Sequence, residues 1–357
     1  MKAIDSMHSG ALLRRIGIVL LSVLAALALG AVFLIILDVN PFTAYYYLLV
    51  RPFGSLNSIG EMTIKMVPIL IVGIGVSFTF QTKLSNLGGE GQICLGAIGM
   101  TLVGTSSFAE AAGGWYIPVG MLVAALFGAL WAGIAGFFKT RFKASEIITT
   151  LLLNYIAVQL LSWCVYYPLR DTAGNIPQSA AVAATLPRLI SGSRMNVGLI
   201  IALACVVVYW VVMKRTKFGY RLRVLGGSIK AATFGGISKR KYYLIVMMIS
   251  GAFAGLAGSI ELAGTQTRLL EGLAGSYGFD GVVASLLGMM NPLGVLLSSV
   301  LLGALSIGAE TMQVRTGVSS LFLNVLEALI VLFILLGFSF FGDGSRKKNK
   351  KGKESEE

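Results

Sequence analysis

Histidine, cysteine and acidic residues are all scarce in this chain of 357 residues. The only histidine is His8, in a polar N-terminal stretch, and Asp and Glu together number 16. A histidine-based metal site or catalytic triad is therefore excluded. The three cysteines, Cys94, Cys164 and Cys205, stand singly in apolar runs without a CxxC motif, as small core residues do.

Nucleotide-binding and hydrolase motifs are also missing. There is no G-x-x-x-x-G-K-[ST] segment, so the chain does not bind ATP through a P-loop of its own. An H-E-x-x-H motif, an Asp-rich cluster and a G-x-S-x-G elbow are absent as well. We therefore expect no catalytic residue, no metal and no cofactor in this chain.

Apolar residues dominate what is present. Hydrophobic residues make up 56% of the chain and charged residues 13%, and the mean hydropathy is +0.82, which is typical of a membrane protein. The net charge of +13 is an orientation signal and indicates no nucleic-acid partner, because 22 of the 29 Lys and Arg fall in five short segments. Those segments are the N-terminus, Lys83, Lys139–Lys143, Lys214–Lys241 and Arg346–Lys353.

Ten apolar stretches are candidate membrane spans. They are Ile16–Leu37, Met62–Phe80, Leu87–Ser107, Ile117–Phe138, Ile147–Tyr167, Val197–Met213, Tyr242–Leu262, Tyr277–Met290, Leu293–Thr311 and Leu321–Phe340. Alternate crossings from an inside N-terminus put all five basic segments in the cytoplasm. The sequence thus predicts an all-α, polytopic transmembrane bundle of about ten spans (8–10) with both termini cytoplasmic. Tyr277–Met290 is short and carries Asp280, which indicates a broken or re-entrant helix.

This pattern predicts one membrane domain and no soluble module. We assign residues 1–15 to a cytoplasmic N-terminus, 16–341 to a single transmembrane domain and 342–357 to a disordered, basic cytoplasmic tail. Pro168–Asn196 is expected to be an ordered external loop. Glycine, with 44 residues, forms stripes such as Gly251, Gly255 and Gly258, which favour close helix packing.

Two acidic residues followed by glycine lie within the apolar stretches, 190 residues apart. Glu90, with Gln92, stands near the expected cytoplasmic start of the third stretch, and Asp280 stands in the eighth. An acid at membrane depth costs a few kcal/mol and usually faces the bundle interior. Their placement suggests a duplicated transporter fold. The alternative is that each acid caps a helix N-terminus, where the dipole favours negative charge.

The segment Lys214–Lys241 holds nine Lys and Arg and no acid. Within it, Ser228 is a suitable N-cap for a short helix over Ile229–Phe234, and Gly235–Gly236 can end that helix. The sequence therefore predicts a surface helix on the cytoplasmic face, where a soluble partner could push on the membrane domain.

Four segments together resemble the permease subunits of bacterial ABC importers. They are NLGGEGQICLGAIG (86–99), SEIITTLLLNYIA (145–157), RTKFGYRLRVLGGSIKAATFGGI (215–237) and YGFDGVVASLLGMMNPLG (277–294). The chain is most similar to the simple-sugar and nucleoside type, which is related to ribose-type and branched-chain amino-acid permeases. The resemblance runs from about Thr63 to Gln313.

The resemblance implies a set of partners in a multi-pass complex of the bacterial cell membrane, surrounded by lipid. It gives the 228–234 helix the role of docking to a cytoplasmic ABC ATPase, which holds the ATP and Mg²⁺. The candidate coupling residues are Ser228, Lys230, Ala231, Ala232, Phe234 and Gly235. A second permease subunit, the same chain or a different one, and an extracellular substrate-binding lipoprotein complete the expected importer.

The substrate implied by the resemblance is a nucleoside or a simple sugar. Polar residues in the apolar stretches that could line its pathway are Asn86, Glu90, Gln92, Asn154, Tyr155 and Asp280. Two other classes of function remain open from the residues alone. An ion-coupled secondary transporter would use intramembrane carboxylates such as Glu90 and Asp280, whereas a structural membrane protein would need neither.

Overall fold

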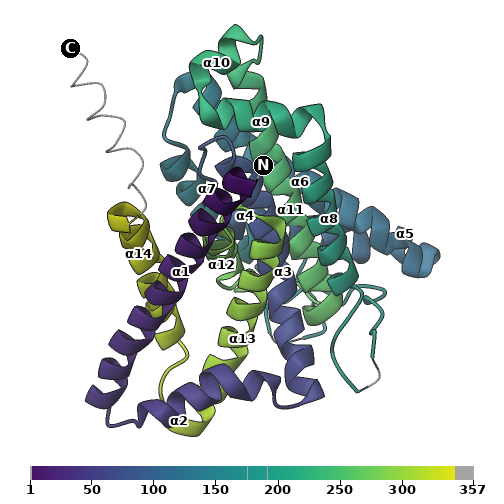
Figure 1. Cartoon of the computed structure of the whole chain (residues 1–357). Helices are drawn as coiled ribbons and strands as arrows, with labels where there is room; N and C mark the ends of the chain where they lie inside the picture. Colours follow the sequence, from purple (N-terminus) through teal and green to yellow (C-terminus); the bar gives the residue numbers. More distant parts are fainter. Residues whose placement is uncertain (1, 175, 191, 342–357) are drawn as a thin grey trace. The chain divides into compact units, whose positions relative to one another are not determined.

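A computed structural model describes residues 2–174, 176–190 and 192–341 of the chain (Figure 1). Most of the described residues are in helices, which are joined by turns and loops. They contain no strand, only two isolated antiparallel β-bridges, Arg170 with Ser179 and Arg188 with Asn196. The all-α prediction is confirmed. The tail predicted over 342–357 lies outside the described residues.

The chain forms two compact units, residues 1–51 with 308–357, and residues 52–307. The first unit contains α1 (Lys2–Ile36), α2 (Pro41–Tyr45), the π-helix η1 (Tyr46–Val50), the end of α13 (Pro292–Thr316) and α14 (Phe322–Phe341). Its core includes Leu34, Ala44 and Met312, all fully buried. Tyr45 Oη donates a hydrogen bond of 2.5 Å to the Leu27 carbonyl, which ties α2 to α1.

The second unit carries the remaining helices. They are η2 (Arg51–Phe53, shared with the first unit), α3 (Leu56–Phe80), α4 (Gly89–Gly104), α5 (Ser107–Ala112), η3 (Gly113–Trp115), α6 (Tyr116–Phe142), α7 (Glu146–Tyr166), α8 (Gly198–Arg215), α9 (Lys217–Gly227), α10 (Ile229–Phe234), α11 (Lys239–Glu261), the π-helix η4 (Leu262–Gln266), α12 (Tyr277–Leu287) and most of α13. The helix expected over Ile229–Phe234 is confirmed, whereas α9 was not anticipated from the sequence.

Each of the ten predicted stretches contains a helix, but the helices differ in reach. Six helical segments of the described chain are long and apolar enough to cross a membrane: Leu56–Phe80, Ser107–Phe142, Glu146–Tyr166, Gly198–Arg215, Lys239–Gln266 and Pro292–Thr316. By contrast, α4 has 16 residues and α12 has 11. At about 1.5 Å per residue these two reach about 24 and 17 Å, short of a hydrocarbon core of about 30 Å. The number of crossings stays a prediction.

Glycine sets the packing of α11 against α4 and α6. A methyl group built on Gly128 of α6 would lie 2.2 Å from the Gly251 carbonyl oxygen, and one on Gly96 of α4 would lie 2.2 Å from that of Gly255. No side chain fits at such distances, so the helix backbones touch directly. The predicted glycine stripe is confirmed as a packing surface.

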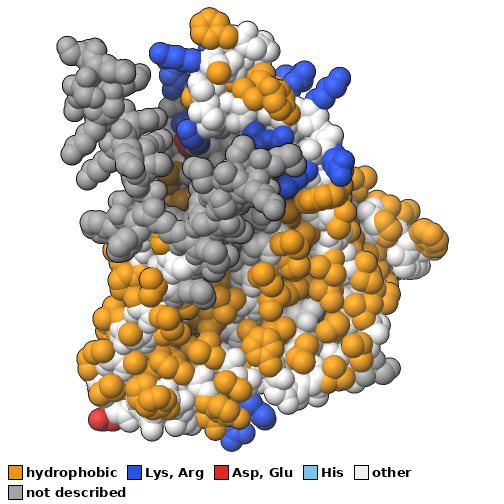
Figure 2. Space-filling view, in the orientation of Figure 1, with side chains coloured by type: hydrophobic (Ala, Val, Ile, Leu, Met, Phe, Trp, Pro, Cys, Tyr) orange, Lys and Arg blue, Asp and Glu red, His pale blue; other side chains and the backbone are white. Residues whose placement is uncertain are grey.

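The surface separates charge from apolar side chains. Figure 2 shows Lys and Arg gathered around α9 and α10, and hydrophobic side chains over α8 below them. On α9 and α10 themselves Lys217 and Lys230 are exposed. A boundary of this kind is what an aqueous region next to a lipid-facing surface requires.

The packing contacts predict a contrast between two glycines of α6. Gly128→Ala should destabilise the protein by about 1–3 kcal/mol, because the new methyl group meets backbone that cannot move aside. Gly133→Ala is the matched control: its nearest neighbour is the flexible Met248 side chain at 3.3 Å, and Ala favours a helix by about 1 kcal/mol over Gly. Thermal unfolding of the purified variants in detergent measures both. Equal midpoints for the two would contradict this account of the α6–α11 contact.

Candidate functional site

The chain loses its helical form between α3 and α4, deep in the protein. Residues 84–88 form neither helix nor strand, and Asn86 among them is fully buried. Its side-chain amide donates 2.8 Å to Ser250 Oγ, at the middle of the 23-residue helix α11. The break therefore lies halfway along the spanning helices. Non-helical backbone is tolerated at membrane depth only where other protein groups satisfy it.

Helix α7 supplies the groups that satisfy this backbone. Asn154 Nδ2 donates 2.8 Å to the Leu87 carbonyl, and Asn154 Oδ1 accepts 2.9 Å from the Gly91 amide. The hydroxyl of Thr150, one helical turn earlier, accepts from the Leu87 amide at 3.4 Å. One asparagine thus pairs with the backbone on both sides of the start of α4, because its amide offers the same donor and acceptor as a peptide group.

A second pair of amides closes the turn from inside. Asn86 and Gln92 exchange two side-chain hydrogen bonds of 3.0 Å, and Asn86 Oδ1 also accepts from the Gly88 amide at 3.0 Å. Both side chains are at most 1% exposed. Asn86 and Gln92 were candidates for the substrate pathway, but their polar atoms bond to each other, to the Gly88 amide and to Ser250. Their position is also deeper than the cytoplasmic start expected from the sequence, because residues 84–88 run inward before the helix begins.

The N-termini of α4 and α12 meet at this level. A methyl group built on Gly89 would lie 2.8 Å from Gly278 Cα, and one on Gly278 would lie 2.3 Å from the Glu90 nitrogen. From this contact α4 runs to Gly104, whose carbonyl accepts from Ala183 of the Pro168–Asn196 loop. Helix α12 runs the other way, toward Met290. Two half-length helices thus start at one point and leave in opposite directions.

The two acids of the sequence pattern stand in the first turns of these half-helices, where the backbone dipole favours negative charge. Asp280 is 3% exposed and accepts a hydrogen bond of 2.7 Å from the hydroxyl of Ser276, the residue just before its helix. Glu90 is half-buried and reaches a cavity. The two acids therefore differ in position: both stand in a first turn, but only Glu90 lines the cavity.

The cavity has a volume of about 500 Å³ and opens beside α7. It is lined by Glu90, Leu151, Asn154, Tyr155, Val158, Gln159 and Phe279. Three of the six predicted pathway residues, Glu90, Asn154 and Tyr155, come together here, and the other three do not line it. Gln159 and Phe279 were missed. Gln159 follows Tyr155 by four residues, so helical spacing alone places both on one face of α7.

Helix α10, predicted from the sequence to be cytoplasmic, has the expected caps. Ser228 Oγ accepts 3.3 Å from the Ala231 amide, and Gly235 with Gly236, whose φ is +72°, ends the helix. Of the coupling candidates, Lys230 and Ala231 are exposed, and Phe234 is 94% exposed. The side chain of Ala232, another coupling candidate, is fully buried in its own chain and is not available for contact with a partner.

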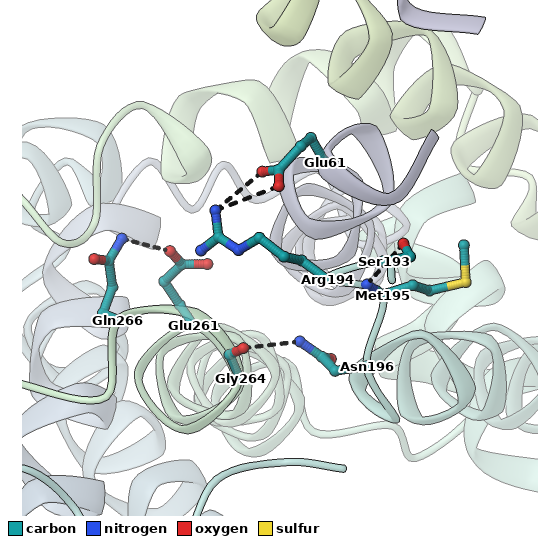
Figure 3. Close-up of polar contacts among 8 residues, drawn as sticks. All are labelled: Glu61, Ser193, Arg194, Met195, Asn196, Glu261, Gly264 and Gln266. Atoms are coloured by element: carbon teal, nitrogen blue, oxygen red, sulfur yellow. Dashed lines mark hydrogen bonds and ion pairs between the residues drawn. The ribbon is translucent and has the colours of Figure 1, made fainter. Parts of the chain in front are cut away.

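At the other end of the second unit, charged side chains fasten the loop to the helices. Arg194 of the loop pairs with Glu61 of α3 at 3.1 Å. Figure 3 shows its guanidinium between Glu61 and the buried carboxylate of Glu261, which accepts 3.1 Å from Gln266 Nε2. The loop expected from the sequence is present, and its external position stays a prediction. Its Arg194 pairs with α3 and lies beside the end of α11 (Figure 3).

The rest of the loop is held by backbone and by a second ion pair. Ser179 and Val182 donate to carbonyls of the 267–269 segment at 3.1 and 3.0 Å. Arg268 Nη1 lies 2.6 Å from Asp171 Oδ2. The hydrogen bond from Arg268, with another from the Ala173 amide, lowers the pKa of Asp171 below its usual value. Asp171 is therefore charged at neutral pH and keeps the pair intact.

Comparison with known proteins places this architecture in a family. Residues 58–338 match the family described as the permease component of the branched-chain amino acid transport system. The chain is a member of this family. It is 35% identical to the glucose ABC transporter permease of Haloferax volcanii over 89% of this chain and 87% of the relative. It is 34% identical to the guanosine ABC transporter permease of Bacillus subtilis, covering 92% and 96%.

A nucleoside ABC transporter permease of Lactococcus lactis is 27% identical, over 91% of this chain and 92% of the relative. The comparisons decide among the functions left open by the residues. The chain is a multi-pass transport subunit of an ABC importer in the cell membrane. This permease is thereby set apart from an ion-coupled secondary transporter and from a structural protein.

The contacts of α7 predict different outcomes for substitutions at two of its polar residues. Asn154→Leu should destabilise the permease by about 1–3 kcal/mol for each of the two backbone groups left unpaired, seen as a lower unfolding temperature. Gln159→Leu, five residues on and facing the cavity, should leave that temperature nearly unchanged and reduce transport. An unfolding temperature unaffected by Asn154→Leu would show that the junction does not depend on this side chain.

Proposed function

We propose that this permease forms one side of a membrane pathway for a nucleoside, lined by the cavity between α7 and the α4–α12 junction. The observation that carries the proposal is that two aromatic rings and several polar groups line the same cavity. Tyr155 is 74% exposed and Phe279 is 42% exposed, and both line the cavity with Glu90 and Gln159.

This lining suits the two halves of a nucleoside. A nucleobase stacks on aromatic side chains with about 1–3 kcal/mol per base, and ribose hydroxyls need hydrogen-bonding groups. Both polar atoms of Asn154 already bond to backbone, which leaves the Tyr155 hydroxyl, the Gln159 amide and the Glu90 carboxylate for the substrate. A simple sugar would use the polar groups but lacks a base to stack. The relatives named for guanosine and for nucleosides agree with this choice, and the relative named for glucose supports the alternative.

The open side of the cavity supports a second permease subunit. Polar side chains at membrane depth are costly against lipid and normally face protein or a water-filled space. Covering α7 with a second subunit, identical or different, would enclose Tyr155 and Gln159 in a shared pathway. An external binding lipoprotein would deliver the substrate at the end where the Pro168–Asn196 loop lies.

Helix α10 is the proposed site of energy coupling. Phe234 presents an apolar ring to solvent at its end, beside the exposed Lys230 and Ala231. An aromatic residue held out in this way suits a groove on a partner protein. We propose that the partner is a cytoplasmic ABC ATPase, which binds ATP and Mg²⁺, while this chain holds no cofactor.

For the substrate, Tyr155→Ala and Phe279→Ala should each lower guanosine uptake about tenfold, the equivalent of one lost stacking contact. Tyr155→Phe keeps the ring and should retain most of the uptake. The measurement is uptake of labelled guanosine and labelled glucose by cells carrying the whole transporter. Glucose uptake with no guanosine uptake would replace the nucleoside by a sugar.

For coupling, Phe234→Ala and Ala231→Trp should abolish substrate-stimulated ATP hydrolysis by the reconstituted importer while the permease stays folded. Lys217→Ala on α9 is the control, because a single exposed charge contributes about 1 kcal/mol or less. Co-purification of the ATPase is measured beside hydrolysis. Full stimulation in both α10 variants would move the docking site away from this helix.

A further inference from the structure

An apolar groove runs along the outer surface between α6 and α11. Its volume is about 320 Å³ and its lining is Leu130, Gly133, Ile134, Phe137, Leu244 and Met248. Leu130 and Phe137 are 54% and 51% exposed and form one wall. The floor opens at Gly133, where a side chain is missing and the nearest neighbour is Met248. From Leu130 to Phe137 the groove follows α6 for about 10 Å, which is less than the depth of one leaflet.

The groove ends beneath basic side chains. Phe137 is followed four residues later by Arg141, and Leu244 is preceded by Lys241 at three residues, so helical spacing puts both cations on the faces that line the groove. Both side chains are exposed, and within the described part of the chain neither forms an ion pair. The nearby Lys139 differs, because it pairs with Glu146 at 2.5 Å.

Position in the fold identifies which leaflet the groove faces. Helix α6 begins at Tyr116, whose hydroxyl bonds to Ala184 of the external loop, and it ends at Phe142. Helix α11 begins at Lys239, directly after the α9–α10 segment. The basic end of the groove is therefore the end that carries α10, the side proposed to be cytoplasmic.

We propose that this groove binds one acyl chain of an anionic phospholipid of the cytoplasmic leaflet, with its phosphate held by Arg141 and Lys241. The apolar walls match a hydrocarbon chain, and the two free cations match the headgroup, each basic residue near a membrane surface contributing about 1 kcal/mol. A protein partner is the weaker occupant, because the polar cavity that needs covering lies on α7. The site is independent of the transported substrate.

The test uses phosphatidylglycerol and phosphatidylcholine that carry a photoreactive group in one acyl chain. Each is added to the whole importer in nanodiscs, and crosslinked peptides are mapped. We expect phosphatidylglycerol to label 130–137 and 244–248 several-fold more than phosphatidylcholine does. Gly133→Leu, which fills the floor, should remove this labelling. R141A combined with K241A should erase the preference between the two lipids.

Two control variants complete the test. K214A combined with K217A removes the same charge elsewhere on the cytoplasmic side and should leave the labelling unchanged. Gly133→Ala leaves most of the groove open and should still be labelled. Uniform labelling of all exposed helices, equal labelling by both lipids, or equal loss in the K214A and K217A control would overturn the proposal. The proposal would also be overturned if the second permease subunit covered the groove and no lipid crosslinked there.

Discussion

The two hydrogen bonds that Asn154 forms with Leu87 and Gly91, where α4 begins, are the constraint on which the functional region depends. They let residues 84–88 stand without helical structure at membrane depth, because protein groups satisfy the backbone there. Because the backbone is satisfied there, α4 can begin halfway along the bundle. Its N-terminus then meets that of α12, and the first turns of two helices, with their acids, come to one place.

This arrangement explains why polar residues of similar type have different roles. Asn86 and Gln92 bond to each other, and Asp280 accepts from Ser276 at the start of its helix, so these three hold the region where α4 and α12 meet. Glu90 stands in the same junction but also reaches the cavity, where Tyr155 and Gln159 approach from α7. The pathway wall is thus built on a structural element, and a change at Asn154 would disturb both stability and transport.

Glycine provides the second general constraint. Direct backbone contact of α11 with α4 and α6 fixes these helices around the break, since a methyl group on either side would collide with a carbonyl. The same absence of side chains has a different effect at Gly133, where no backbone faces the gap and a groove remains. Glycine therefore allows tight helix packing at Gly128 of α6 and leaves an open surface groove at Gly133, just over one helical turn later.

The sequence alone determined the helical class, the positions of the apolar stretches, the capped helix over Ile229–Phe234 and the glycine stripe, because these depend on local composition, spacing and capping chemistry. It also drew attention to Glu90 and Asp280. Only the tertiary structure decided that the two acids stand at facing half-helices, that Asn86 and Gln92 bond internally, and that Ala232 points into its own chain. Contacts between residues far apart in the chain made these decisions: Leu87 with Asn154, and Gly89 with Gly278. No local pattern records which helix will supply the partner of a buried amide.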